Sequence, residues 1–412
     1  MSDELAPPSV LLLTTYPIVK PRHGGQLRAR ALAASYRSGG FSVAHLAVVE
    51  KGAFPRESLG PLDVEFPTDD PRWFVGGKNV PLSNDLRSGV YAAEFEEAYQ
   101  KILKSISARI DVFHLEQPWL LPLVRRLKTE KRYANAAIVY GSQNIEAPLR
   151  EAIFRQLSIP DGAGVVDGIL SVETEACRVA DLTLAVAPFD HDTLIKFGAQ
   201  NVLRAPNGIE AWKNNAKDVE RWKATLKVRR IALFVGSAHP PNFDGFFRAF
   251  GDSLGFVPPD CRIVVAGSVG PHIFDYYHRM RFNTLNLSRI HVTGELSEDD
   301  LAALKSLTSV FLLPIFEGGG SNIKTAEAIY SGKQVIATSA SLRGYERFTH
   351  LPEIVVADTK DQFRLALRKA LSPTPGAPPT NDEQRALRSG LLWHECLSVV
   401  APAVQKLLPV VR

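Results

Sequence analysis

FLLPIFEGGGSNIKTAEAIYSGKQVIATS, residues 311–339, joins an apolar run to a glycine-rich turn and then to a helical pattern. The apolar run at 310–315 is short enough to be a buried parallel strand. The turn EGGG at 317–320 follows, and apolar residues at helical spacing predict a helix from Ser321 to Ser331. Gly332 suits a helix end, and residues 334–338 predict the next strand. The stretch is therefore predicted to be a β-α-β unit.

The junction of strand, turn and helix predicts an anion-binding site. Unpaired backbone amides point outward at a helix N-terminus, and the helix dipole favours negative charge there. Lys324, one turn into the helix, can add a cation for a phosphate, and Glu327 can accept two hydroxyl hydrogen bonds from a ribose. Glycines between a strand and a helix also occur where packing is merely tight, and the turn has neither a P-loop nor a full GxGxxG pattern. Tight packing without a phosphate therefore stays open as the alternative.

Length and composition indicate a two-domain globular protein. A chain of 412 residues with 45% apolar and 22% charged residues is expected to form two domains of ordinary size. A net charge of +4 is too weak to indicate nucleic-acid binding. No run is long and apolar enough to span a bilayer, and the N-terminus shows no signal-peptide pattern. Three widely spaced cysteines suit reduced core thiols, so we expect a cytoplasmic protein.

The βα pattern runs through the chain twice, with paired glycines, Gly24 and Gly25, after the first strand. This repetition predicts an α/β fold of two doubly wound domains that face each other. The expected strands of the first series lie at 10–14, 41–49, 112–115, 138–141, 182–187 and 202–205. Those of the second series lie at 231–236, 262–267, 290–294, 310–315, 334–338 and 354–357.

Three segments follow from this pattern. Residues 1–208 form the first domain and residues 209–380 the second. A proline-rich stretch at 372–379 precedes a helical pattern at 383–408. We expect residues 381–412 to cross back as a helix and to cover the first domain with apolar side chains such as Leu397, Val400 and Val404.

The motifs in their order resemble the GT-B glycosyltransferases, specifically the retaining, family 4-like group 1 enzymes that include bacterial cell-surface sugar transferases. The resemblance covers nearly the whole chain. Its pieces are GGQLRARALAASYRSGGFSV, FHLEQPWLLPLVRRL, VYGSQNIEAPLR, ADLTLAVAPFD, APNGIE, LFVGSAHPPNFDGF, VVAGSV, HVTGEL and GGGSNIKTAEAIYSGKQVIAT. It implies two Rossmann-like domains, of which the second binds a nucleotide-sugar donor and the first binds the acceptor.

The resemblance also implies roles for individual residues. Glu327 corresponds to the carboxylate that holds the ribose hydroxyls, and Lys324 to the lysine that binds the diphosphate and assists its departure. Glu295 and Leu296 stand where the base is usually cradled. The residues expected beside the diphosphate or the sugar are Gly319, Gly320, Ser321, Asn322, Gly24 and Gly25.

The chain departs from the family pattern at several of these positions. A first glutamate is usual eight residues before the ribose carboxylate, but Gly319 stands there, and a loop shift would be needed to bring Glu317 to the sugar as a catalytic residue. Ser237 replaces the basic residue that often follows the first strand of the second domain. Gln143 replaces a histidine near the transferred sugar, with Asn144 beside it as a polar anchor.

Histidine, acidic and basic motifs elsewhere have structural alternatives. His114 could face the acceptor cleft or be a satisfied histidine at a strand end. The Asp190-His191-Asp192 motif could hold a metal, but N-capping of a helix is the favoured interpretation, and no metal or other cofactor is expected. The basic run at 125–132 could meet anionic lipid headgroups or be an ordinary solvated face.

The predicted function is transfer of a sugar from a nucleotide sugar to a glycan, lipid-linked or small-molecule acceptor, with retention, in cell-surface glycan or glycoconjugate biosynthesis. We expect it in the cytoplasm or peripherally at the inner face of the membrane, without a nucleic-acid partner. Two alternatives remain open. A sugar-nucleotide epimerase would form products from the donor alone, and a non-catalytic GT-B subunit would bind a donor or a partner without turnover.

Overall fold

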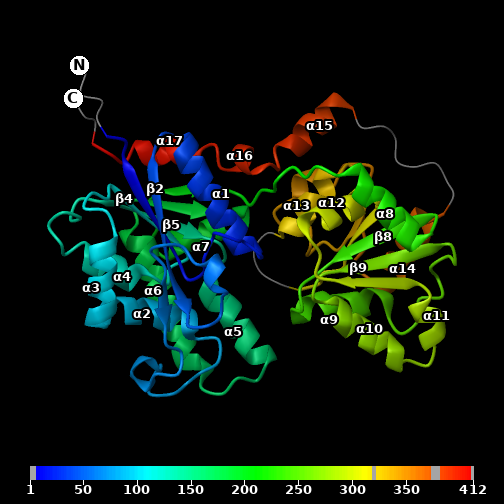
Figure 1. Cartoon of the computed structure of the whole chain (residues 1–412), viewed down its shortest axis with the longest axis horizontal. Helices are drawn as coiled ribbons and strands as arrows, with labels where there is room; N and C mark the ends of the chain where they lie inside the picture. The colour runs from blue at the N-terminus through cyan, green and yellow to red at the C-terminus, as the bar shows by residue number, and fades with distance from the viewer. Residues whose placement is uncertain (1–5, 318–321, 373–380, 410–412) are drawn as a thin grey trace. The chain divides into compact units, whose positions relative to one another are not determined.

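The computed structural model describes residues 6–317, 322–372 and 381–409, and the chain divides into two compact units (Figure 1). The N-terminal unit comprises Met1–Asn207 together with Trp393–Arg412, and the C-terminal unit comprises Gly208–Leu392. The first change of unit thus falls at Asn207, beside the expected limit at residue 208. The chain re-enters the N-terminal unit at Trp393, later than the expected residue 381.

A seven-stranded parallel sheet forms the centre of the N-terminal unit, with strand order β3-β2-β1-β4-β5-β6-β7. The chain enters at β1, moves outward through β2 and β3, and then returns to β4 on the other side of β1. This change of direction makes the loops after β1 and β4 a topological switch point. The strands are β1 (Ser9–Thr14), β2 (Ser42–Glu50), β3 (Val64–Phe66), β4 (Val112–Glu116), β5 (Ala137–Ser142), β6 (Leu182–Ala185) and β7 (Val202–Arg204).

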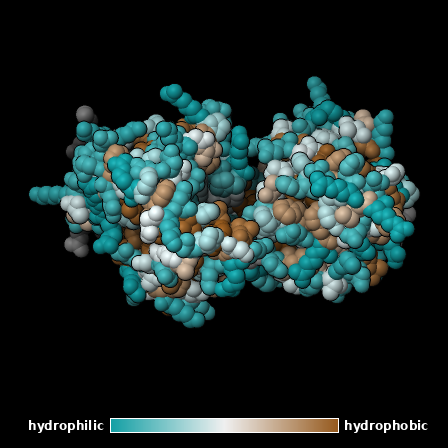
Figure 2. Space-filling view, turned by 90° about the horizontal axis from the view of Figure 1, so that it is seen from below, coloured by the Kyte–Doolittle hydropathy of each residue, from teal (hydrophilic) through white to brown (hydrophobic). Residues whose placement is uncertain are grey.

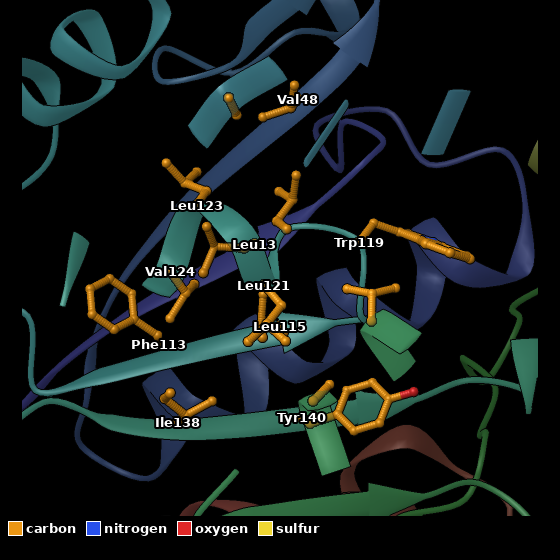
Figure 3. Close-up of a cluster of buried hydrophobic side chains, with 14 of the residues drawn as sticks. Leu13, Val48, Phe113, Leu115, Trp119, Leu121, Leu123, Val124, Ile138 and Tyr140 are labelled. Carbon is orange, nitrogen blue, oxygen red and sulfur yellow. The ribbon is translucent and has the colours of Figure 1, made fainter. Parts of the chain in front are cut away.

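Helices lie along this sheet because the connections between parallel neighbours must cross its faces. They are α1 (Gly24–Ser38), α2 (Asn84–Glu94), α3 (Glu96–Ser105), α4 (Leu121–Leu127), α5 (Glu146–Gln156), α6 (Gly162–Val179) and α7 (Pro188–Lys196). Figure 3 shows how one face is filled: Leu13, Phe113 and Ile138 come from three neighbouring strands and lie beside Leu123 and Val124 of α4. All five are buried, so this layer supplies part of the hydrophobic stabilisation of the unit.

A six-stranded parallel sheet forms the centre of the C-terminal unit, with strand order β10-β9-β8-β11-β12-β13. The chain moves outward from β8 to β10 and then restarts at β11 on the other side of β8. A second switch point therefore lies at the loops after β8 and β11. The strands are β8 (Arg230–Val235), β9 (Cys261–Ala266), β10 (Ile290–Gly294), β11 (Val310–Leu313), β12 (Gln334–Ala337) and β13 (Ile354–Val356).

Two hydrophobic layers enclose this second sheet. Phe246, Phe250 and Val265 belong to one layer, and Ala303, Leu304 and Ile329 belong to the other. The helices are α8 (Ala216–Leu226), α9 (Pro240–Phe250), α10 (Gly270–Arg279), α11 (Asn283–Leu287), α12 (Glu298–Leu307), α13 (Ile323–Tyr330), α14 (Lys360–Ala370) and α15 (Asp382–Ser389). The prediction of an α/β chain with two doubly wound parallel sheets is confirmed.

The C-terminal segment differs from the single helix expected at 383–408. It forms three helices: α15 in the C-terminal unit, then α16 (Trp393–Cys396) and α17 (Val400–Gln405) in the N-terminal unit. Helix α15 ends at Ser389, before Gly390. The carbonyl of Leu391 then accepts a hydrogen bond from the amide of Ile209 (2.9 Å), which holds the link between α15 and α16 in place. The last two helices cover α1, where Ser35 Oγ donates to the carbonyl of Leu397 (3.0 Å).

The surface of each unit is mostly polar on the face that Figure 2 shows, with apolar side chains scattered among the hydrophilic ones. Isolated apolar side chains are normal on a protein surface. Within the described residues, no helix is both long enough and apolar enough to cross a membrane.

Candidate functional site

The switch point of the C-terminal unit brings together several predicted site residues. Ser237 follows β8, and Asn322 and Lys324 lie at the start of α13, which follows β11. The carboxyl ends of parallel strands at a switch point are where open α/β sheets bind ligands. Gly319, Gly320 and Ser321, expected beside the phosphates, lie outside the described residues.

Asn322 begins α13. Its side-chain Oδ1 accepts a hydrogen bond from the backbone amide of Lys324 (3.1 Å), which makes Asn322 the N-cap of the helix. An asparagine is among the best N-caps because it satisfies an amide that has no partner within the helix. The expectation that Asn322 also meets the phosphates or the sugar stays a prediction.

Lys324 reaches from α13 to α9, the helix that follows β8. Its Nζ donates to Asn242 Oδ1 (3.2 Å), and Asn242 Nδ2 donates in turn to the carbonyl and the Oγ of Ser237 (2.9 and 3.2 Å). Burial lowers the pKa of Lys324 to about 8, while the nearby Glu327 carboxylate raises it. Among the described residues the ammonium thus has a neutral hydrogen-bond partner and keeps donors for an anion. Asn242 was missed as a site residue, although it lies within the PPNFDG motif.

Glu327 lies one turn further along α13 and forms an ion pair with a lysine of another helix. Lys305 of α12 places its Nζ 2.6 Å from Glu327 Oε1, so Glu327 pairs with Lys305 and not with Lys324. Lys305 is almost fully buried, whereas the Glu327 side chain is 24% exposed. Glu327 and Lys324 also line one small cavity, together with Leu233, Val235, Phe311, Leu312 and Leu313. The two predicted ligand-binding side chains therefore share one site.

The other predicted residues of the C-terminal unit lie apart from this cavity. Glu317 is 78% exposed, and its Oε1 lies 3.5 Å from Nη1 of Arg248, which is also exposed. Glu295 is exposed just after β10, while Leu296 packs against the layer that contains Leu304. The structure thus brings Lys324, Glu327, Asn242 and Ser237 together and does not bring Glu317 to them.

Gly25 lies at the switch point of the N-terminal unit, at the start of α1. A Cβ on Gly25 would lie 2.9 Å from Gln143 Oε1, closer than real Cβ atoms come, and a tight 3.0 Å from the Tyr16 hydroxyl. Neighbouring Gly24 is exposed. Gly25 therefore lets the loop after β1 approach Gln143 closely, whereas the expected contact of the two glycines with a diphosphate stays a prediction.

A buried network centred on Glu116 supports Gln143. Glu116 Oε1 accepts hydrogen bonds from Arg28 Nε (2.6 Å) and Gln143 Nε2 (3.0 Å), and Oε2 lies 3.0 Å from His114 Nε2. Burial alone would raise the pKa of Glu116, but Arg28 and the bonds from His114 and Gln143 hold it below its ordinary value. Glu116 is thus a buried, charged acceptor that orients three side chains around it.

His114 does not face a cleft, which corrects one of the two interpretations of this residue. It is fully buried, and its Nδ1 lies 2.8 Å from the Tyr36 hydroxyl while its Nε2 meets Glu116. The structure supports the alternative, a satisfied histidine on a strand. The suggestion of exposure rested only on the position of His114 near a strand end. A histidine at such a position can face solvent or meet buried partners, and the sequence alone does not distinguish the two.

The side-chain carbonyl oxygen of Gln143 points away from this network. A carboxylate can only accept hydrogen bonds, so the amide group of Gln143 must turn its NH₂ towards Glu116, with Tyr16 Oη 2.5 Å away. The Oε1 atom therefore points towards Gly25. Asn144 Nδ2 donates a hydrogen bond to Glu146 Oε1 (3.3 Å). This contact fits the role of a polar anchor of the loop that carries Gln143.

The loop that carries Gln143 and Asn144 is anchored at the start of α5. Glu173 of α6 accepts hydrogen bonds from the amides of Glu146 (2.8 Å) and Ala147 (3.1 Å). Burial raises the pKa of Glu173 to about 7, while the two amide bonds lower it. Glu173, which no sequence motif singled out, therefore fixes the position of this loop.

The Asp190-His191-Asp192 motif lies inside a helix and does not cap it. Helix α7 begins at Pro188, Ala187 is its N-cap, and Asp190 falls within the first turn. The capping prediction is wrong because Pro188 is favoured at the first helical position and starts the helix earlier. Among the residues that the structure describes, no group of three or more His, Cys, Asp or Glu side chains could hold a metal ion.

The basic run at 125–132 is engaged in contacts within its own unit. Arg125 pairs with Glu175, and Arg126 pairs with Glu96 while its guanidinium lies 3.7 Å from the ring centroid of Tyr99. These acidic partners offset much of the positive charge that suggested a lipid surface. Membrane contact through this run stays a prediction.

The family comparison concerns the unit that holds Lys324 and Glu327. Residues 229–372 match the family described as glycosyl transferases group 1. A comparison of the sequence with curated proteins gives no match. The sequence pattern of the family is therefore found in the C-terminal unit.

Solved structures extend the likeness to the whole fold. Sucrose-phosphate synthase from Thermosynechococcus elongatus is similar with a TM-score of 0.67, 15% identity, and coverage of 97% of this chain and 99% of that one. Anabaena HepE in complex with UDP and glucose has a TM-score of 0.64 and 14% identity, with coverage of 97% and 99%. WaaG, a glycosyltransferase involved in lipopolysaccharide biosynthesis, has a TM-score of 0.59 and 15% identity, with coverage of 97% and 98%. Together these comparisons show that residues 229–372 match the group 1 glycosyl transferase family and that the whole chain shares the two-domain fold of these solved structures.

Proposed function

We propose that this chain transfers a sugar from a nucleotide-sugar donor to an acceptor, with retention of the anomeric configuration, in the synthesis of a cell-surface glycan or glycoconjugate. The donor binds the C-terminal unit at the switch point after β8 and β11. The acceptor is a glycan, a lipid-linked sugar or a small molecule bound by the N-terminal unit.

The observation that carries the proposal is the pair of side chains on α13. Lys324 offers a cation beside the first turn of a helix that follows a glycine-rich stretch, and Glu327 offers a partly exposed carboxylate one turn further on. The two side chains line one small cavity, so a ligand that contacts Lys324 with its diphosphate has Glu327 nearby for its ribose. A similar structure, that of Anabaena HepE, holds UDP and glucose.

The reaction needs stabilisation of a departing diphosphate and of an oxocarbenium-like sugar. Lys324 and the amides at the start of α13 supply positive charge for the diphosphate without proton transfer. Double displacement would need a carboxylate close to the anomeric carbon. Glu317 is exposed and 3.5 Å from Arg248, so we favour attack on the same face from which the diphosphate leaves. In this mechanism the leaving phosphate takes the proton of the acceptor hydroxyl.

A donor screen tests the proposal. Purified protein is heated with UDP-, GDP-, ADP- and TDP-sugars, and a donor that binds only the folded state must raise the melting temperature. The best donor is then incubated with candidate acceptors, and NMR spectroscopy of the product determines the anomeric configuration. A retained configuration supports the proposal, whereas inversion or products formed from the donor alone contradict it.

A non-catalytic GT-B subunit is the second candidate. Two observations favour it: Gln143 stands where relatives carry a histidine, and Glu317 lies in solvent. Such a subunit would show the same melting shift with a nucleotide sugar but no transfer to any acceptor and no slow hydrolysis of the donor. Turnover that is lost on Lys324→Ala would exclude this candidate.

A further inference from the structure

Lys305 is a buried cation of the C-terminal unit. It contacts Glu327, one of the predicted ligand-binding side chains. Lysine is almost never fully buried unless it is paired. Its side chain is 6% exposed, and its Nζ lies 2.6 Å from Glu327 Oε1 and 4.8 Å from the ring centroid of Trp212. Trp212 in turn packs edge-on against Tyr330 of α13 (5.3 Å between ring centroids).

This arrangement constrains one carboxylate oxygen of Glu327. The Oε1 atom lies next to the buried ammonium of Lys305, which also lies over the ring of Trp212. The Glu327 side chain as a whole remains 24% exposed. A carboxylate with one oxygen bound in this way keeps its charge and a preferred orientation, while its remaining lone pairs can accept hydrogen bonds.

Lys333 provides a contrast within the same region. It is also a poorly exposed lysine beside the end of α12, and burial lowers its pKa to about 8. Its Nζ, however, donates to the backbone carbonyls of Ser306 and Thr308, the latter at 2.6 Å. Lys333 therefore satisfies carbonyls at a helix end, a structural task. Among the described residues, Lys305 donates to Glu327 and to no backbone carbonyl.

We infer that Lys305 is a positioning residue that orients the Glu327 carboxylate to accept the two ribose hydroxyls of a nucleotide. The inference rests on the proposed function, because it requires a ribonucleotide at this site. Lys305 does not touch the ligand and acts through Glu327. Lys324, by contrast, donates to Asn242 and has no direct contact with Lys305 among the contacts of the described residues.

The test compares nucleotides with and without ribose hydroxyls. Isothermal titration measures the Kd of wild type and Lys305→Met for whichever of UDP, ADP and GDP binds best, and for the matching 2′,3′-dideoxynucleoside diphosphate. Lys305→Met should weaken binding of the ribonucleotide about tenfold, the effect expected from losing the orientation of one charge-assisted acceptor. It should leave the affinity for the dideoxy analogue unchanged, because the analogue offers Glu327 no hydroxyl.

Three further variants make the result specific. Lys333→Met is the matched control and should leave the ratio of the two affinities at its wild-type value. Lys305→Arg retains the charge and should recover most of the ribonucleotide affinity. Lys305→Met combined with Glu327→Gln should bind no more weakly than Glu327→Gln alone, because the effect of Lys305 passes through Glu327. Thermal unfolding confirms that each variant is folded.

The outcomes separate this inference from the proposed function. If wild-type protein binds none of the three ribonucleotides and none of the sugar nucleotides of the donor screen, the proposed function fails and the role of Lys305 fails with it. If it binds only a TDP-sugar, only the inference is overturned. If Glu327→Gln weakens ribonucleotide binding but Lys305→Met does not, only the inference is overturned. Equal losses for the ribonucleotide and the dideoxy analogue in Lys305→Met would also overturn it, because they would show a general structural effect.

Discussion

The two switch points of this molecule differ in the groups that their cations contact. In the N-terminal unit, the fully buried Arg28 faces the carboxylate of Glu116 at 2.6 Å, so the positive charge is compensated within the protein. In the C-terminal unit, Lys324 meets the neutral amide of Asn242, while Lys305 takes up the charge of Glu327. A cation that is ion-paired within the protein holds side chains in place, whereas a cation whose hydrogen-bond partner is a neutral amide keeps donors for an anion. This difference is why we propose the C-terminal switch point as the diphosphate site.

The largest effect on stability is expected for Arg28→Met. The substitution leaves Glu116 charged and buried without its cation, and breaking a buried pair in this way costs about 3–5 kcal/mol. Urea unfolding monitored by circular dichroism measures the loss. Arg28→Met combined with Glu116→Gln removes both charges and should recover part of the stability. A loss below about 1 kcal/mol in the single variant would show that Arg28 does not compensate Glu116.

The largest effect on turnover is expected for Lys324→Ala. Charge accumulates on the diphosphate as the glycosidic bond breaks, so loss of the cation should lower kcat by about a hundredfold or more. Steady-state kinetics with the best donor measures this change. The variant should fold normally, because the hydrogen-bond partner Asn242 is neutral and no buried charge is left unpaired. Wild-type turnover in Lys324→Ala would mean that the lysine merely packs at the helix start.

Glu327→Gln should affect donor binding more than turnover. It replaces a charged acceptor of the ribose hydroxyls, and such hydrogen bonds contribute about 1.5–3 kcal/mol, or roughly a tenfold to hundredfold change in affinity. The ribose is remote from the reacting bond, so the loss should appear mainly in KM. An equal fall in kcat with unchanged KM would place Glu327 at the reacting centre instead.

The sequence was informative about fold for a physical reason. Buried parallel strands are short continuous apolar runs, and the run at 310–315, for example, contains β11 at Val310–Leu313. The break of the last helical segment at Gly390 was not predicted, because its apolar spacing continues through the break. Helical periodicity records which face is buried, not whether the backbone hydrogen bonds are continuous.

Site residues were predictable where one local motif carries them and not where distant elements meet. Lys324 and Glu327 lie on one short helix, so their spacing alone indicated a shared site. Their partners, by contrast, are distant in sequence: Asn242 lies 82 residues from Lys324, and Lys305 lies 22 residues from Glu327. Similarly, His114 and Arg28 meet at Glu116 only once α1 has packed against β4.

The smallest effect is expected from removal of metal ions. If Lys324 and the helix amides stabilise the leaving diphosphate, excess EDTA should leave kcat and KM unchanged within error. Added Mg²⁺ or Mn²⁺ should not stimulate the treated enzyme. A loss of activity in EDTA that Mn²⁺ restores would show that a metal ion shares this task.

The most direct test of the account is the pH dependence of nucleoside diphosphate binding to wild type and Lys324→Met. Burial lowers the pKa of Lys324 to about 8, so the free protein loses this cation as the pH rises through that value. Isothermal titration from pH 6.5 to 9.5 should therefore show wild-type affinity that is greatest at low pH and falls above pH 8. Lys324→Met should bind more weakly throughout and lack this fall. Equal affinity and an equal pH profile for the two proteins would contradict the claim that Lys324 is the cation of the diphosphate site.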